Sequence, residues 1–522
     1  MNILEIIIEQ SPPLIIAIPL LGAFLTPLIS RLSGKARNVF VGIVIALTGF
    51  LIALLASDVF ANGPRTYVFG AKNLALPVVR ILFEVDSLSV FMAIVTFILA
   101  FVSLVYSWSF MNKENDGLDK YYTLILLLFT STLGMELTGD IFNFFVFLEI
   151  SCISSCALIA FYTGRGESVE AAFKYIVISS IGALFVLFAI GLLYSQYNAL
   201  NIATLAHVIQ YTFLDKIVLM LFIAVLGMKA GLVPMHMWLP DAYGEAPSSV
   251  TIIIIGATQA SLYGVLRICF TLYGGMFQNV TINSFVIGWI ILVLAIITIL
   301  IGVIMALIQT DFRRLIAYAA VAEIGYIFLG VGVGLAVLSN PGLMEVGKTA
   351  MQGGVFHIIN DSLDIGLLFL VAGAIYYTTK ESSLDKMGGL ARNMKYTTIF
   401  FVIGLLAVSG MPPMNGFASK LLIYESIYQL NPILSIIAIL CSILLLATFV
   451  KVLHSAFLGP KLPKFDDVKE VPRSMLLAMG IIAAIIIFFG LFPEFVLNNL
   501  VKPAVDALVS NASYISKVLG VI

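Results

Sequence analysis

Residues 405–422, LLAVSGMPPMNGFASKLL, place a lysine beside a double proline inside a long hydrophobic segment. Residues 223–238, IAVLGMKAGLVPMHMW, repeat that pattern with Lys229 and Pro234. A charged side chain at membrane depth is costly and is kept mainly where it has a partner or lines a water-filled path. Irregular backbone at that depth is tolerated where it is buried in protein or faces a cavity, and corresponding broken helices point to a transport site. The two segments therefore predict ion movement past Lys229 and Lys420.

The composition of the chain is that of a membrane protein. Of its 522 residues, 61% are hydrophobic and 11% are charged, which is far from the usual soluble proportions. Apolar runs long enough to cross a bilayer recur along the chain, so the expected fold class is all-α: a polytopic membrane protein of about 14 transmembrane helices. The formal net charge of −1 lacks the positive footprint of nucleic-acid binding, and no nucleic-acid partner is expected.

The segment from 397 to 428 is too long for one straight crossing. It is interrupted at Gly410, Pro412, Pro413 and Gly416. Proline in a helix interior removes a hydrogen bond and breaks the helix. We therefore expect two half-helices with an unwound middle.

The distribution of Lys and Arg predicts the orientation in the membrane. Alternate loops between the predicted spans hold seventeen basic residues, and the loops on the other side hold seven. The chain is expected to be a multi-pass protein of the cell (cytoplasmic) membrane. Because positive residues collect on the cytoplasmic side of a membrane protein, both termini are expected on the outer side of that membrane. The asymmetry also favours an even number of spans.

The cysteines predict no cofactor or metal. Cys152 and Cys156 are one helical turn apart in an apolar segment, and Cys269 and Cys441 stand alone in others. None of these spacings forms a zinc or iron–sulfur ligand set. Any electron transfer is therefore expected in another protein, and no catalytic residue is assigned to this chain.

Two charged residues in the first half are candidates for ion translocation. Glu149 follows a run of apolar and aromatic residues, where a lone carboxyl group would stay neutral unless a cation held it charged. Lys229 is the natural cation. A separation between Glu149 and Lys229 that varied between two states would load and release a proton.

The second half adds candidates on neighbouring segments. His357, Asp361 and Asp364 are spaced i, i+4, i+7 and so share one helical face. An apolar helix gains nothing from such a stripe unless it faces water or partners. Glu323 and Lys420 lie in adjacent segments and complete the acidic and basic groups.

With these residues, the chain resembles the antiporter-like membrane subunit family. That family includes the antiporter-like subunits of the Mrp-type sodium/proton antiporters and the pumping subunits of respiratory complex I and of membrane-bound hydrogenases. The likeness covers nearly the whole chain and is carried by five stretches: FEVDSLSVFMA at 83–93, GDIFNFFVFLE at 139–149, KAGLVPMHMWLPDAYGEAPSSV at 229–250, QTDFRRLIAYAAVAEIGYIFLG at 309–330 and GMPPMNGFASK at 410–420.

The resemblance implies a fold of fourteen helices with two inverted five-helix repeats, each containing one broken helix. It divides the chain into N-terminal helices (1–120), a first repeat with a Glu149/Lys229 half-channel (121–275), a second repeat with an Asp364/Lys420 half-channel (282–458) and a C-terminal helix and tail (459–522).

The resemblance also implies the function. The chain is expected to translocate protons, sodium or both as a subunit of a membrane-bound respiratory or antiporter complex. The implied partners are other antiporter-like and small membrane subunits, the lipid bilayer, and a peripheral redox module of hydrogenase or dehydrogenase type. A counter-gradient is the alternative source of energy.

Three positions depart from the family pattern, and one of them is Glu323, an acidic residue that most members lack. Gln259 stands where the family usually has a lysine or histidine, and Asp364 stands where a lysine is common. Glutamine can hydrogen-bond water but cannot titrate. Two readings remain open: water carries the ion past Gln259, or the chain is a degenerate, non-conducting subunit that holds a larger assembly together or transmits force. A stand-alone solute symporter would also contain broken helices, but it would not explain the five stretches.

Overall fold

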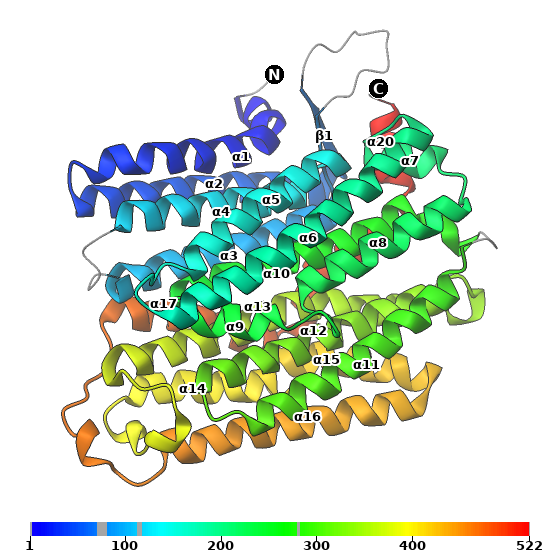
Figure 1. Ribbon diagram of the computed structural model, residues 1–522. Coiled ribbons are helices and arrows are strands. Elements are labelled where there is room, and N and C mark those ends of the chain that lie inside the picture. Colours follow the sequence, from blue (N-terminus) through cyan, green and yellow to red (C-terminus); the bar gives the residue numbers. More distant parts are fainter. Residues whose placement is uncertain (1–2, 70–80, 112–116, 279–281, 521–522) are drawn as a thin grey trace.

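The computed structural model describes residues 3–69, 81–111, 117–278 and 282–520. Within these ranges, 11 helices are long and apolar enough to cross a membrane, and they lie side by side with their axes roughly aligned (Figure 1). They are α1 (Ile3–Ser30), α2 (Gly34–Asn62), α3 (Ser87–Phe110), α5 (Ile141–Ile159), α6 (Gly166–Tyr197), α10 (Ser248–Leu266), α11 (Ser284–Ile308), α12 (Phe312–Val337), α13 (Met344–Thr379), α16 (Pro432–Val452) and α17 (Arg473–Leu491).

The expected class of multi-pass helical membrane protein is confirmed. A count of about 14 crossings is reached only if α4 and the two broken segments cross as well, and it stays a prediction. Those segments are α4 (Leu118–Leu137), α8 (Phe213–Ala230) with α9 (Trp238–Glu245), and α14 (Lys395–Val408) with α15 (Asn415–Leu430); the short helices are α7 (Ile202–Val208), α18 (Pro493–Val496), α19 (Lys502–Val509) and α20 (Ala512–Leu519).

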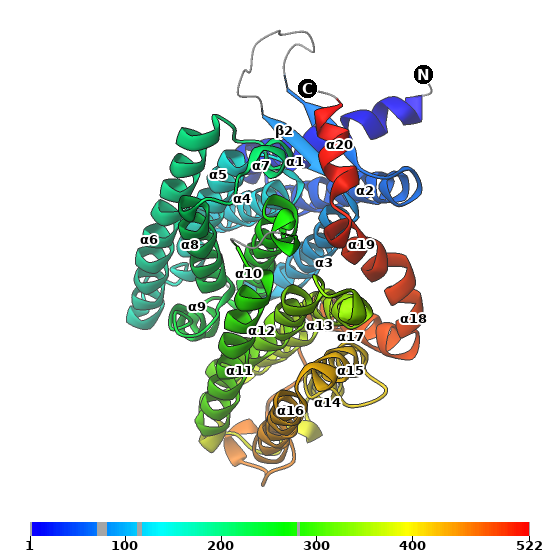
Figure 2. The ribbon, with the colours of Figure 1, turned by 90° about the vertical axis from the view of Figure 1, so that its right-hand side faces the viewer.

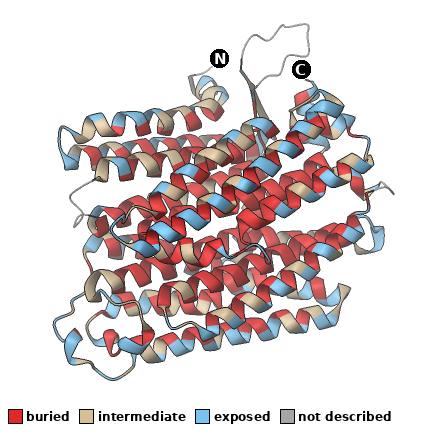
Figure 3. Cartoon of the chain, in the orientation of Figure 1, coloured by how far each residue is buried: buried red, intermediate tan, exposed pale blue. Residues whose placement is uncertain are grey.

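Three helices form the centre of the bundle. The most apolar stretches of α10, α12 and α13 are 100% buried, whereas those of α1, α6, α16 and α17 are at most 39% buried. Figure 3 shows this layering as buried residues inside and exposed residues on the outer helices, and Figure 2 shows the central helices end-on, with others around them. Charged residues on α10, α12 and α13 are therefore shielded from lipid by protein.

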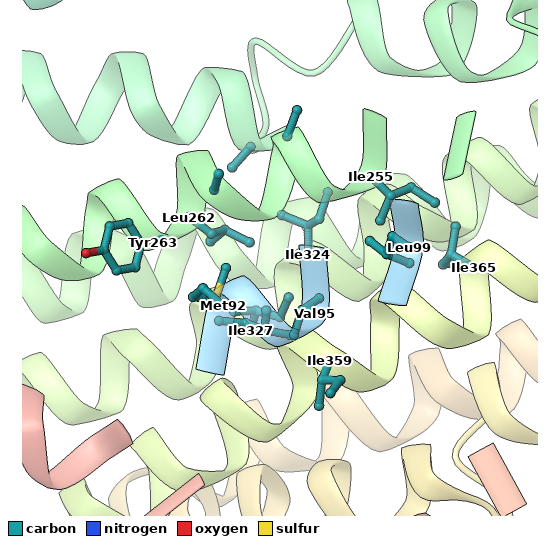
Figure 4. Packing of buried hydrophobic residues seen from close by; sticks show 14 of the residues in the cluster. Met92, Val95, Leu99, Ile255, Leu262, Tyr263, Ile324, Ile327, Ile359 and Ile365 are labelled. Carbon is teal, nitrogen blue, oxygen red and sulfur yellow. The ribbon is translucent and has the colours of Figure 1, made fainter. Parts of the chain in front are cut away.

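The central helices approach closely because small residues line their contacts. A Cβ added at Gly302 of α11 would come 2.6 Å from the backbone nitrogen of Ala322 in α12. A Cβ at Gly330 of α12 would come 2.7 Å from the carbonyl oxygen of Ala350 in α13. Small residues let membrane helices pack backbone against backbone. Larger apolar side chains from α3, α10, α12 and α13 fill the remaining core (Figure 4).

Both predicted breaks are present and begin in the same way. Gly231 follows α8 with φ +94° and Gly410 lies in the α14 break with φ +66°. Glycine adopts these angles without a steric penalty. Leu232 N–H donates to the Gly227 carbonyl at 2.8 Å, and Met411 N–H donates to the Leu406 carbonyl at 2.9 Å, which is the bond of a Schellman cap. An X–Pro peptide bond in each break is cis.

The segment between α2 and α3 contains a β-hairpin that the sequence analysis did not predict. Strand β1 (Arg65–Val68) pairs antiparallel with β2 (Leu82–Val85), and the intervening residues 70–80 lie outside the described ranges. The hairpin lies at the end of the bundle that also holds the two labelled termini (Figure 1). Glu84 on β2 and Asp86 before α3 are both buried.

Candidate functional site

Lys420 of the second break forms a buried ion pair with Glu323 of α12. Its Nζ lies 2.8 Å from Glu323 Oε1 and donates to the Val408 carbonyl at 2.7 Å, at the end of α14. The last carbonyls of a helix have no partner within the helix and carry partial negative charge, so they suit a cation. The break therefore provides Lys420 with a second oxygen besides the Glu323 carboxylate.

His357 of α13 joins this pair. Its Nε2 lies 2.9 Å from Glu323 Oε2, at ion-pair distance but without hydrogen-bond angles. Its Nδ1 lies 2.9 Å from the Ser419 hydroxyl oxygen. The Lys420 ammonium also lies 4.4 Å from the centre of the Tyr326 ring, within cation–π range. Lys420 and Glu323 are 1% exposed and His357 is 0% exposed, so the three groups are fully buried in protein.

Amide and hydroxyl side chains extend the cluster along α13 and α15. Asn360 donates to the Ser419 hydroxyl at 2.9 Å, and Asn415 donates both to the Asn360 side-chain oxygen at 3.1 Å and to Asp364 Oδ1 at 3.0 Å. Asp364 and Lys420 were expected to be the pair of the second half-channel. In the structure Asp364 is hydrogen-bonded to Asn415 and the ion-pair partner of Lys420 is Glu323, and their common half-channel stays a prediction.

Gln259 of α10 contacts the same stripe. Its side-chain nitrogen donates to Asp361 Oδ2 at 2.6 Å, and both residues are buried. The Gln259 Oε1 and the Asp361 Oδ1 have no hydrogen-bond partner within the described part of the chain. Gln259 therefore fills the family's basic position as a neutral donor to a carboxyl group.

Lys229 lies at a small polar cavity in the first half. It is 7% exposed and belongs to the last turn of α8, where the helix dipole favours a cation. The cavity has a volume of about 20 Å³ and is also lined by Ser151, Ser179, Thr258 and Ser261. Its size and hydroxyl lining suit about one water molecule.

The predicted ion pair between Glu149 and Lys229 is not formed in this structure. No N–O distance of 4.0 Å or less joins the two residues, which are both described, and Glu149 Oε1 has no hydrogen-bond partner. Glu149 is half-buried on α5, although α5 and α8 each pack on α10. Glu149 and Lys229 nevertheless interact electrostatically, so they are neighbours without an ion pair.

Tyr243 of α9 connects the two halves and was missed by the sequence analysis. Its hydroxyl lies 2.7 Å from the Thr258 hydroxyl at the Lys229 cavity. It also interacts electrostatically with Asp361. The structure thus brings Gln259, Glu323, His357, Asp361, Asp364 and Lys420 together. Lys229 shares its cavity with Thr258, whose hydroxyl contacts Tyr243, and Glu149 interacts electrostatically with Lys229.

The arrangement defines a class of protein: a multi-pass helical membrane protein with two broken helices and a connected set of acidic, basic and amide side chains at its centre. The chain belongs to the NADH:quinone oxidoreductase/Mrp antiporter transmembrane family, whose model matches residues 138–446. This match confirms the resemblance drawn from the five stretches.

Two relatives and one solved structure show how far the similarity extends. The chain is 32% identical to NADH-quinone oxidoreductase subunit N of Desulforudis audaxviator, over 94% of this chain and 98% of that protein. It is 28% identical to a Na(+)/H(+) antiporter subunit of Alkalihalophilus pseudofirmus, over 91% of this chain and 92% of that protein. The fold is shared with a chain of the Mrp complex from Dietzia sp. DQ12-45-1b, with a TM-score of 0.87, 24% identity and coverage of 98% and 99%.

Proposed function

We propose that the chain is an ion-translocating subunit of a multi-subunit respiratory or antiporter complex in the cell membrane. The observation that carries this proposal is the buried cluster of Lys420, Glu323 and His357, continued by hydrogen bonds through Ser419 to the residues of α13. Charged groups at membrane depth mark ion paths and proton relays. A purely structural core of this size would be expected to use apolar side chains, because a buried ion pair adds little net stability.

The proposed path is a relay across the centre of the bundle. It begins at Lys229 and its water-sized cavity, continues by Thr258 and Tyr243 to Asp361, and reaches Lys420 through the side chains of α13 and α15. Gln259 does not titrate in this path. Its role is to hold the Asp361 carboxyl group, while Tyr243 and water bridge the position that a basic residue would fill.

The ion proposed for this network is the proton. Its members are hydrogen-bond donors and acceptors that can pass protons, and the Glu323 oxygens already face Lys420 and His357. Sodium prefers several hard oxygen ligands, and carboxylate oxygens occur along the stripe. Measuring transport with and without sodium, at constant ionic strength, distinguishes the two ions.

The orientation and the partners are part of the same proposal. Both termini lie outside, as the Lys and Arg distribution predicts, and each five-helix repeat contributes one broken helix to the path. The two named relatives belong to an NADH-quinone oxidoreductase and to a Na(+)/H(+) antiporter. Other antiporter-like and small membrane subunits, with either a redox module or a counter-gradient, are the partners that this similarity supports.

The experiment is ion pumping by the complex in sealed membrane vesicles. Lys229→Ala is expected to abolish coupled ion movement while the complex still assembles. The matched control is Lys216→Ala, which removes a lysine from the beginning of the same helix, α8, outside the network. Unchanged pumping in Lys229→Ala would refute the proposal.

A further inference from the structure

A second group of buried charged side chains lies outside the central network. It gathers Glu84 from β2, Asp86 at the start of α3 and Arg267 at the end of α10. Their exposed fractions are 0%, 1% and 2%. The hairpin places this group toward the end of the bundle that holds both termini (Figure 1), and nothing in the central relay uses it.

Arg267 is fully engaged in this group. Its guanidinium pairs with Asp86 and donates to the Tyr263 hydroxyl at 3.0 Å, to Ser89 at 3.1 Å and to Thr271 at 3.3 Å. Asp86 also caps α3 by accepting from Ser89 N–H at 3.0 Å. These bonds give Asp86 and Arg267 a structural role.

Glu84 has no such role. Both of its carboxyl oxygens are buried without a hydrogen-bond partner, and its side chain packs so closely on residue 139 that only glycine fits there. The charged and titratable groups that act on it are Arg267, Asp86 and Tyr514. Burial raises the pKa of the Glu84 carboxyl well above its ordinary value; Arg267 lowers it and Asp86 raises it. Burial therefore favours the neutral acid at Glu84, and Arg267 is placed to stabilise its anion.

The other elements that pack on β2 do not pair with Glu84. On β1, Arg65 pairs with Asp58. On α4, Glu136 accepts a hydrogen bond from Thr96 at 2.7 Å. The buried Tyr514 hydroxyl of α20 is the one neutral polar group that faces Glu84 among the groups acting on it, and as a hydrogen-bond donor it lowers the pKa of the Glu84 carboxyl in opposition to burial.

Helix α10 connects this group to the central network. Gln259, Tyr263 and Arg267 follow at i, i+4 and i+8 and so lie on one helical face. The Tyr263 hydroxyl lies 3.0 Å from Ser89 Oγ. A small cavity of about 10 Å³ touches Tyr263, Arg267 and Thr138, but its lining is mostly apolar, so the link along α10 depends on the side chains themselves. Gln259 is the residue of this helical face that contacts Asp361, and its side-chain oxygen has no hydrogen-bond partner within the described residues.

We propose that Glu84 is a proton-exchange site at the end of the bundle that holds the termini, and that the Gln259, Tyr263 and Arg267 face of α10 links it to Asp361. The step is a proton transfer: the O–H bond of the Glu84 carboxylic acid breaks, its proton goes to a water molecule, and the carboxylate that remains is stabilised by Arg267. A proton from the opposite side restores the acid. This inference rests on the proposed function, because it gives the central relay an opening to that end of the bundle.

Glu84→Gln tests the site in the assembled complex. Glutamine keeps the shape of the side chain but cannot titrate, so coupled ion movement in vesicles is expected to fall about tenfold or more. Glu84→Asp keeps a carboxyl group and is expected to retain most of the activity. Wild-type ion movement in folded Glu84→Gln protein overturns the proposal.

Infrared difference spectroscopy gives a readout that does not depend on transport. The wild-type complex is expected to show a protonated carboxyl band at neutral pH that shifts in Glu84→Asp. If Glu84→Gln fails to assemble, the absence of that shift overturns the proposal instead. Lys229→Ala is measured in parallel: full activity in that variant contradicts the proposed function, whereas loss in Lys229→Ala with full activity in Glu84→Gln contradicts this site alone.

Discussion

Lys420 and Glu323 are 97 residues apart in the sequence and 2.8 Å apart in the structure. The proline break turns the chain so that Lys420 reaches both the carboxylate of α12 and the last turn of α14. Because both side chains are 1% exposed, neither can find water if the other is removed. The two residues are therefore coupled in stability, and we propose that they are coupled in ion movement.

Lys420→Met is expected to destabilise the protein. It leaves the Glu323 carboxyl group buried with His357 alone, and breaking a buried ion pair costs about 3–5 kcal/mol. Thermal unfolding of the purified complex measures the loss. The double variant Glu323→Gln/Lys420→Met removes both charges and is expected to recover most of the stability but none of the ion movement. Additive losses in the double variant would show that the pair is not coupled.

Ser419→Ala is expected to weaken the cluster by removing a shared hydroxyl. His357 and Asn360 both use that hydroxyl, and a buried group left without its partner costs about 1–3 kcal/mol. Ion movement should fall with stability. Ser426→Ala on the same helix is the control, because its hydroxyl donates only to the Leu422 carbonyl one turn earlier. Equal effects of the two substitutions would argue against a special role for Ser419.

Gln259→Leu is expected to reduce ion movement more than stability. It removes the donor that holds Asp361 at 2.6 Å and leaves that carboxyl group without its neighbour on α10. Vesicle transport and thermal unfolding are measured on the same preparations. Gln352→Leu, at a half-buried position of α13 outside the network, is the control. If both variants transport like wild type, Gln259 does not organise the path.

The stability contributed by Glu84 is expected to depend on pH. Its pKa is raised by burial from the ordinary value of 4.5, so above that value the folded protein keeps a proton that the unfolded chain has released. Stability is then highest below the ordinary pKa and falls as the pH rises toward the raised value. Glu84→Gln removes this dependence. By this linkage, the unfolding temperature of Glu84→Gln minus that of wild type should increase from about pH 5 upward. A difference in unfolding temperature that does not change with pH would contradict the raised pKa.

Much of the fold could be predicted because membrane spans follow from hydrophobicity alone. The break at Gly410, Pro412 and Pro413 was located from the residues, since proline and glycine act locally on the backbone. The β-hairpin was missed because its strands are only four residues long and are separated by more than ten residues in the sequence. The burial of Glu84 could not be predicted, because it depends on how β2 packs against α1, α3 and α4.

The sequence predicted which residues belong to the site but not which of them contact one another. The spacing of His357, Asp361 and Asp364 gave one helical face, and Asn360, three residues after His357, could have been added by the same periodicity. The partner of Lys420 could not be chosen from sequence, because Glu323 and Asp364 lie on different helices and both carry a carboxyl group. The Glu149 and Lys229 pair was expected from charge, and the two groups interact electrostatically, although they form no ion pair in this structure.

The most direct test of the central claim is proton movement by the complex in vesicles with Glu323→Gln, compared with Glu345→Gln at the exposed start of α13. Glutamine keeps the volume of Glu323 but removes the charge that binds Lys420 and His357. We predict that Glu323→Gln lowers the proton flux about tenfold or more in an assembled complex and that Glu345→Gln leaves it unchanged. Wild-type flux through assembled Glu323→Gln complex would show that ions do not pass through the buried network.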